Sequence, residues 1–99
     1  MIIIAGTFRA PAGRLDAALG AMEAMILASR AEPGCLTYAY SRDVLDPDLI
    51  RVVEIWRDAA AFAAHLDSGH IQSWRAQWPE LGLHERRLER FESGPGVAV

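Results

Sequence analysis

The chain has 99 residues, enough for one small domain, and 52% of them are hydrophobic. Its formal net charge is −3 and every basic residue is an arginine, so the sequence lacks both a basic stripe for nucleic acid and a lysine for Schiff-base chemistry. No apolar stretch is long enough to cross a membrane and no signal-peptide pattern is visible, so we expect a cytoplasmic protein.

Hydrophobic periodicity and chain-breaking residues divide the chain into alternating strands and helices. Runs of β-branched and alternating side chains predict strands, and apolar residues at helical spacing predict helices. Pro33-Gly34 ends the first helix, Ser68-Gly69 interrupts the second helical region and Pro79 closes it. In chain order, the predicted elements are a strand over 2–8, a helix over 14–30, strands over 35–43 and 49–56, helical pieces over 59–66 and 70–78, and a strand over 83–91.

This order of elements predicts an α+β fold with the ferredoxin-like split βαβ pattern. Four antiparallel strands then form one sheet, with both helical regions packed on the same face. Residues 2–91 are expected to form the domain, and residues 92–99 a C-terminal tail.

The predicted sheet is apolar on both faces. In the first strand, Ile2 and Ile4 point to one side and Ile3 and Ala5 to the other. An antiparallel sheet with one solvated face normally alternates apolar and polar residues, and the helices can cover only one face. We therefore expect the second face to pack against a second copy of the chain, as a twofold dimer with a barrel-like core.

Two histidines follow the apolar strand that ends in Glu54-Ile55-Trp56. Histidine titrates nearest to neutral pH and can accept a proton, while Trp56 offers flat apolar surface, so this region is a candidate site for a small aromatic molecule. His65 and His70 lie five residues apart, and the break at Ser68-Gly69 can direct both toward one cavity. His65 is the preferred base; the alternative is that one histidine caps a helix and the other hydrogen-bonds within the core.

Several aromatic residues are candidates for the walls of that site. Trp56, Trp74 and Phe62 are expected to contact the substrate, whereas Trp78 is more typical of a core or dimer contact. Tyr38 and Tyr40 share one strand face, where their hydroxyls either hold a substrate oxygen or fill the sheet surface.

Glu54 lies among apolar neighbours, so its carboxylate must be paired or protonated. Arg75 or Arg9 is the expected partner, and a structural ion pair is favoured over catalysis. Two imidazoles without a third ligand do not make a metal site, and no nucleotide-binding motif is present, so we expect neither a metal nor a cofactor.

A set of short motifs accompanies this order of elements: Glu32-Pro33-Gly34-Cys35, Tyr38, Glu54-Ile55-Trp56 and His65-Leu66 with Ser68-Gly69-His70. Together they resemble the antibiotic biosynthesis monooxygenase (ABM) domain family over residues 2–91. The resemblance implies a dimeric α+β barrel and a family that includes cofactor-independent monooxygenases, haem-degrading proteins and an isomerase.

The resemblance differs between branches of the family. The haem-degrading branch places an Asn, a Trp and an iron-ligating His where this chain has Thr7, His65 and Arg75, so haem degradation is not expected. The quinol-oxidising branch carries the same residue types at Glu54, Trp56, His65 and His70.

The resulting hypothesis is a cofactor-independent monooxygenase in which a histidine deprotonates a small hydroxylated aromatic, which then reacts with O2. Two alternatives remain open at this stage: a non-catalytic dimeric module that binds a small apolar metabolite, and an isomerase or cyclase that uses the same base without oxygen.

Overall fold

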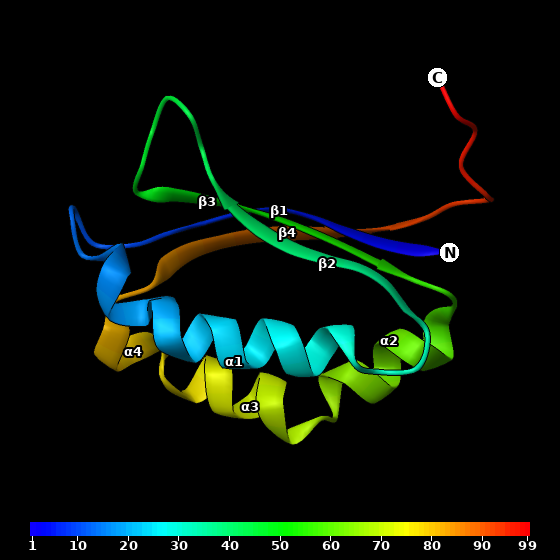
Figure 1. Cartoon of the computed structure of the whole chain (residues 1–99), viewed down its shortest axis with the longest axis horizontal. Helices are drawn as coiled ribbons and strands as arrows, with labels where there is room; N and C mark the ends of the chain where they lie inside the picture. Colours follow the sequence, from blue (N-terminus) through cyan, green and yellow to red (C-terminus); the bar gives the residue numbers. More distant parts are fainter.

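Four antiparallel strands form a single sheet in the order β2-β3-β1-β4, and all the helices lie on one side of it (Figure 1). A computed structural model of the chain describes residues 1–99. Its elements are β1 (Ile2–Arg9), η1 (Leu15–Ala18), α1 (Leu19–Arg30), β2 (Cys35–Arg42), β3 (Leu49–Trp56), α2 (Ala59–Leu66), α3 (Gly69–Ala76), α4 (Trp78–Leu81) and β4 (His84–Glu92). The predicted α+β architecture, with four antiparallel strands and the helices on one face, is confirmed. None of the helices combines the length and apolar character needed to span a lipid bilayer.

Two helix boundaries differ from the sequence prediction. The region expected to be helical from residue 14 starts as the 3-10 turn η1, because neither Arg14 nor Ala18 supplies a side-chain cap. Pro79 does not end the second helical region. It lies in the first turn of α4, where a missing backbone N–H leaves no hydrogen bond unmade, and Gly82 ends that helix in a left-handed conformation.

Strand alternation divides the sheet into two faces. The residues directed toward the helices form the core and include Ile2, Ile4, Phe8, Tyr38, Ile50, Val52 and Trp56. On the opposite face, Ile3 pairs with Ile55 and Phe91, and Ala5 pairs with Val53. Val53 is 42% exposed and Phe91 50% exposed, so the outer face is apolar and no helix of the chain covers it (Figure 1).

Gly6 is the point of closest approach between β1 and β4. A Cβ at this position would lie 1.9 Å from the backbone oxygen of Arg87, so no other residue fits without moving the strand. This contact holds β4 in register beside β1, with Gly6 opposite Leu88.

Replacing Gly6 by alanine is therefore expected to destabilise the protein by about 3 kcal/mol, because the methyl group must displace backbone rather than a flexible side chain. Gly20→Ala is the matched control: it adds the same methyl group in α1, where nothing lies within 4 Å, and should be neutral or stabilising. Urea denaturation of the two variants measures the difference. Equal stabilities of the two variants would show that β4 moves to accommodate the methyl group, and would contradict the prediction.

Candidate functional site

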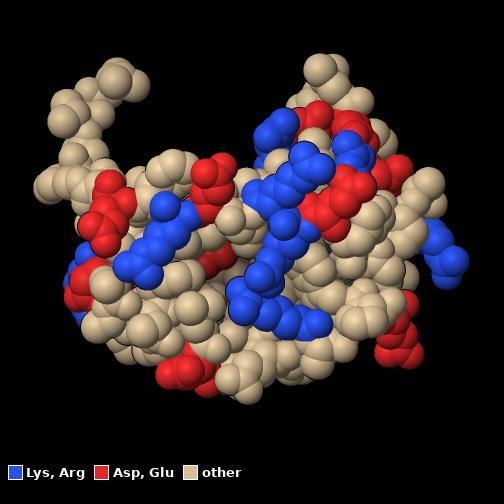
Figure 2. Space-filling view, turned by 180° about the vertical axis from the view of Figure 1, so that it is seen from behind, with Lys and Arg blue, Asp and Glu red and all other residues tan.

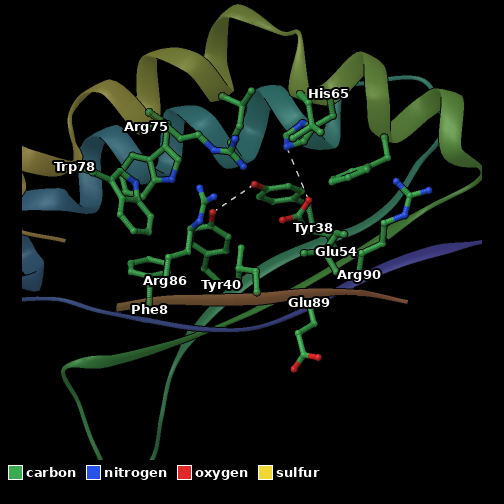
Figure 3. Close-up of a pocket in the computed structure, with 16 residues that line it drawn as sticks. Phe8, Tyr38, Tyr40, Glu54, His65, Arg75, Trp78, Arg86, Glu89 and Arg90 are labelled. Carbon is green, nitrogen blue, oxygen red and sulfur yellow. Dashed lines mark hydrogen bonds and ion pairs between the residues drawn. The ribbon is translucent and has the colours of Figure 1, made fainter. Parts of the chain in front are cut away.

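A pocket of about 380 Å³ lies between the helices and the sheet, within the usual size range of small-molecule sites. Figure 2 shows a hollow on this side of the molecule with basic side chains on both sides of it. Its apolar walls include Ile4, Phe8, Phe62, Ile71 and Trp74. The polar groups that reach it include Tyr38, Tyr40, Glu54, His65, Arg75 and Arg86 (Figure 3). An apolar cavity with a few convergent polar groups is suited to a small molecule with hydroxyl substituents.

His65 is fixed in this pocket by hydrogen bonding at one nitrogen, with the other directed toward the cavity. Its side chain projects from α2 and the residue is 1% exposed. Nδ1 lies 2.6 Å from Oε2 of Glu32, and Nε2 lies 3.8 Å from Oε1 of Glu54. Because the Glu32 carboxylate accepts a hydrogen bond, the proton belongs on Nδ1 and the lone pair on Nε2. Burial lowers the pKa of His65, an effect that Glu32 opposes, so the ring is a neutral base at pH 7.

Glu32 is the functional residue that sequence reasoning missed. It stands just after α1, where the sequence indicated only a motif at the end of the helix and no role in the site, yet its Oε2 also lies 2.8 Å from Nε2 of His70. The break at Ser68-Gly69 does bring the two imidazoles together, but they meet at Glu32. His70 does not line the pocket. Ser68 completes the cluster by donating a hydrogen bond to the His65 carbonyl over 2.6 Å.

The same three side chains place potential metal ligands within 4.8 Å of one another, at Glu32, His65 and His70. Their separations are those of hydrogen bonds: the carboxylate oxygen is 2.6 and 2.8 Å from the two nitrogens. A tetrahedral zinc ion bonded at about 2 Å would hold its ligand atoms about 3.3 Å apart. The geometry therefore fits a carboxylate accepting from two imidazoles, and the expectation of a site without metal stays a prediction.

Glu54 lines the pocket without the arginine ion pair expected from the sequence. Burial raises its pKa to about 7, while a hydrogen bond from Nε1 of Trp56 and the charge of Arg75 act in the opposite direction. The Trp56 hydrogen bond is 3.1 Å long. Arg9, the other expected partner, pairs with Asp46 and Glu85 instead. The carboxyl is therefore close to half-protonated at neutral pH.

Trp56 and Trp78 take different places from those predicted. Trp56 is fully buried beneath the site and does not line the pocket, because α2 packs over it; its contribution is the hydrogen bond to Glu54. Trp78, expected to be a core or dimer contact, lines the pocket together with Trp74. Phe62 also lines it, as expected.

The two tyrosines stack with their ring centroids 5.6 Å apart and their hydroxyl oxygens 3.4 Å apart. Burial raises the pKa of Tyr38, and it raises that of Tyr40 to about 12. Both phenols are therefore protonated at neutral pH and are available as hydrogen-bond donors or acceptors to a bound oxygen.

Comparison with known proteins places these features in a family. Residues 1–77 match the family model described as antibiotic biosynthesis monooxygenase. Among solved structures, a candidate monooxygenase of that type from Deinococcus radiodurans superposes with a TM-score of 0.91 at 24% identity, covering 100% of this chain and 98% of that one.

A protein from Pseudomonas aeruginosa is 30% identical with a TM-score of 0.81, over 95% of this chain and 93% of that one. An uncharacterised protein of Synechocystis sp. is 25% identical over 80 residues, which cover 81% of this chain. The match spans 54% of the length of that relative.

The raised pKa of Glu54 predicts a pH-dependent loss of stability. The pKa of the carboxyl is 4.5 for an unperturbed glutamate and about 7 in the folded protein, so below pH 4.5 both states are neutral and the group has no effect. As the pH rises from 4.5 to 7 the unfolded state ionises first, and the folded state loses stability until both are ionised.

Glu54→Gln should remove this loss, and the variant should be more stable than the native protein at pH 8 by about 2 kcal/mol, with the gap closing toward pH 4.5. Thermal or urea unfolding across this range measures the gap. Glu89→Gln changes an exposed carboxylate on β4 and should show no such gap. Parallel stability curves for Glu54→Gln and the native protein would contradict the prediction.

Proposed function

The chain belongs to the antibiotic biosynthesis monooxygenase family, and we propose that it is a cofactor-independent monooxygenase that acts on a small hydroxylated aromatic substrate. The observation that carries this proposal is the Glu32–His65 pair. It supports a neutral imidazole whose free nitrogen faces a cavity with aromatic walls.

The first step is deprotonation of the substrate. A phenolic hydroxyl beside Nε2 of His65 donates a hydrogen bond to the lone pair and then transfers its proton. The imidazolium that forms is stabilised by Glu32, whose carboxylate already accepts from Nδ1 at 2.6 Å. The hydroxyls of Tyr38 and Tyr40 favour the phenolate oxygen in the same cavity.

The second step is the reaction of this electron-rich anion with O2. One oxygen atom enters the ring to give a quinone, and the other leaves as water. The two hydrogens lost by the substrate, one from the hydroxyl and one from the ring carbon, are those of the water. The residues of the pocket deprotonate the hydroxyl group, orient the aromatic ring and exclude water from it, while the substrate anion supplies the electrons.

His65→Gln is expected to reduce oxygen consumption with dihydroxynaphthalenes by roughly 10²–10⁴-fold, because an amide cannot accept the proton. Glu32→Gln should give a smaller loss of activity. It leaves His65 in place but weakens the hydrogen bond that keeps the proton on Nδ1. The measurement is oxygen uptake by metal-free protein, with circular dichroism to verify folding.

His84→Gln is the matched control, because His84 is exposed on β4 and outside the pocket, and it should retain full activity. Equal activity of His65→Gln and His84→Gln would refute the role of the base. Substrate binding with no turnover would indicate the non-catalytic module, and turnover without oxygen the isomerase or cyclase.

We also propose that the active form is a twofold homodimer that buries the outer face of the sheet. The support is the apolar stripe of Ile3, Ala5, Val53, Ile55 and Phe91, which this chain does not cover. Two copies of such a face are self-complementary, as a twofold interface requires.

Val53→Glu should weaken the dimer roughly hundredfold, because the symmetry brings two carboxylates into an apolar interface. Leu27→Glu is the control: Leu27 is 58% exposed, but on α1 in the helical layer, and its substitution should leave the association unchanged. Sedimentation velocity over a concentration series measures both. A native chain that stays monomeric at high concentration would disprove the assembly.

A further inference from the structure

The positive charge in the pocket is not fully neutralised by nearby carboxylates. Arg75 from α3 and Arg86 from β4 both line it, and Figure 3 shows their guanidinium groups turned into the cavity from opposite walls. Neither group has a carboxylate within ion-pair distance, whereas five of the ten arginines in the chain do form ion pairs: Arg9, Arg42, Arg51, Arg57 and Arg90.

 Arg75 and Arg86 are thus free cations, whereas Arg90, the third arginine of the pocket, lies 3.7 Å from Glu92 and 5.6 Å above the ring of Phe62.

The acidic residues near the pocket do not balance these charges. Glu54 is held partly protonated by burial. Glu89 is directed away from the cavity, on the far side of the sheet (Figure 3). Two guanidinium groups that face one half-enclosed cavity repel each other, and the lower dielectric there strengthens the repulsion. An anion between them would relieve it.

Hydrogen-bond donors are also in excess in this part of the pocket. Each guanidinium carries five N–H donors and no acceptor. The indole N–H groups of Trp74 and Trp78, in the adjacent walls, have no acceptor either. A bound group that offers several acceptor oxygens therefore fits this end of the cavity better than a neutral ring edge does.

We propose that the pocket binds its aromatic ligand through a carboxylate held by Arg75 and Arg86, so that the substrate is a hydroxylated aromatic acid rather than a neutral phenol. This inference rests on the proposed function for the role of the hydroxyl group, which lies toward His65. A carboxylate is favoured because its two oxygens match the planar fork of a guanidinium, and because aromatic and aliphatic side chains elsewhere in the walls fit a fused aromatic ring.

The test compares two probes that differ only in the acid group, 6-hydroxy-2-naphthoate and 2-naphthol, by isothermal titration calorimetry without oxygen. The native protein should bind the acid roughly tenfold more tightly than the neutral naphthol, as charge-assisted hydrogen bonds predict. Arg75→Gln and Arg86→Gln should each remove most of this preference while leaving 2-naphthol binding nearly unchanged. Added salt should reduce the preference in the native protein.

Arg87→Gln is the matched control. Arg87 is adjacent to Arg86 on β4 and is also exposed, but its side chain belongs to the outer face and does not line the pocket. It should keep the full preference for the acid. Equal affinity for the two probes, binding of neither probe, or an equal loss in Arg87→Gln would overturn the inference.

The outcomes also separate this inference from the proposed function. Tight binding of the acid that depends on both arginines, without oxygen uptake from any hydroxyarene, would uphold the subsite and reject the monooxygenase. Oxygen uptake with neutral dihydroxynaphthalenes, together with no preference for the acid, would uphold the monooxygenase and reject the subsite.

Discussion

One carboxylate oxygen, Oε2 of Glu32, holds the candidate site together. It lies 2.6 Å from Nδ1 of His65 and 2.8 Å from Nε2 of His70, and so joins the end of α1 to α2 and α3. Removal of this carboxylate would leave a buried imidazole N–H without an acceptor, which is costly. The same hydrogen bond that stabilises the packing also decides which nitrogen of His65 faces the cavity. The packing around His65 and the identity of its free nitrogen therefore both depend on the hydrogen bond to Glu32.

Burial acts on both titratable groups at the inner end of the pocket, and in each case it favours the neutral form. It lowers the pKa of His65 and raises that of Glu54, so the imidazole loses its proton more readily and the carboxyl keeps its own. Arg75 and Arg86 are exposed and carry the positive charge of the guanidinium group. The pocket therefore has a nearly neutral inner end for a hydroxyl group and a cationic part for an acidic one.

Much of the fold could be predicted from the sequence because its signals are local. Runs of β-branched residues along 2–8 and 49–56 predicted the strands, and the lack of polar alternation indicated that both faces of the sheet are apolar. The site was predictable only in part. His65, Tyr38 and Phe62 are near the pocket, as their spacing indicated, but sequence alone could not show that α2 covers Trp56 completely.

Contacts between distant residues explain what sequence reasoning missed. Glu32 meets His65 and His70 across 33 and 38 residues, and no local pattern records such a pairing. Arg86 was overlooked for a different reason: residues 83–91 were predicted only as a strand, and none of its side chains was assigned to the site. Its alternation nevertheless places Arg86, Leu88 and Arg90 toward the pocket, and this period-two pattern is present in the sequence. The central strands link the two faces in the same way, since Glu54 at the pocket lies between Val53 and Ile55 of the outer face. A partner copy packed on that face would fix the strand that positions Glu54 and would leave the pocket, on the opposite side of the sheet, open to its ligand.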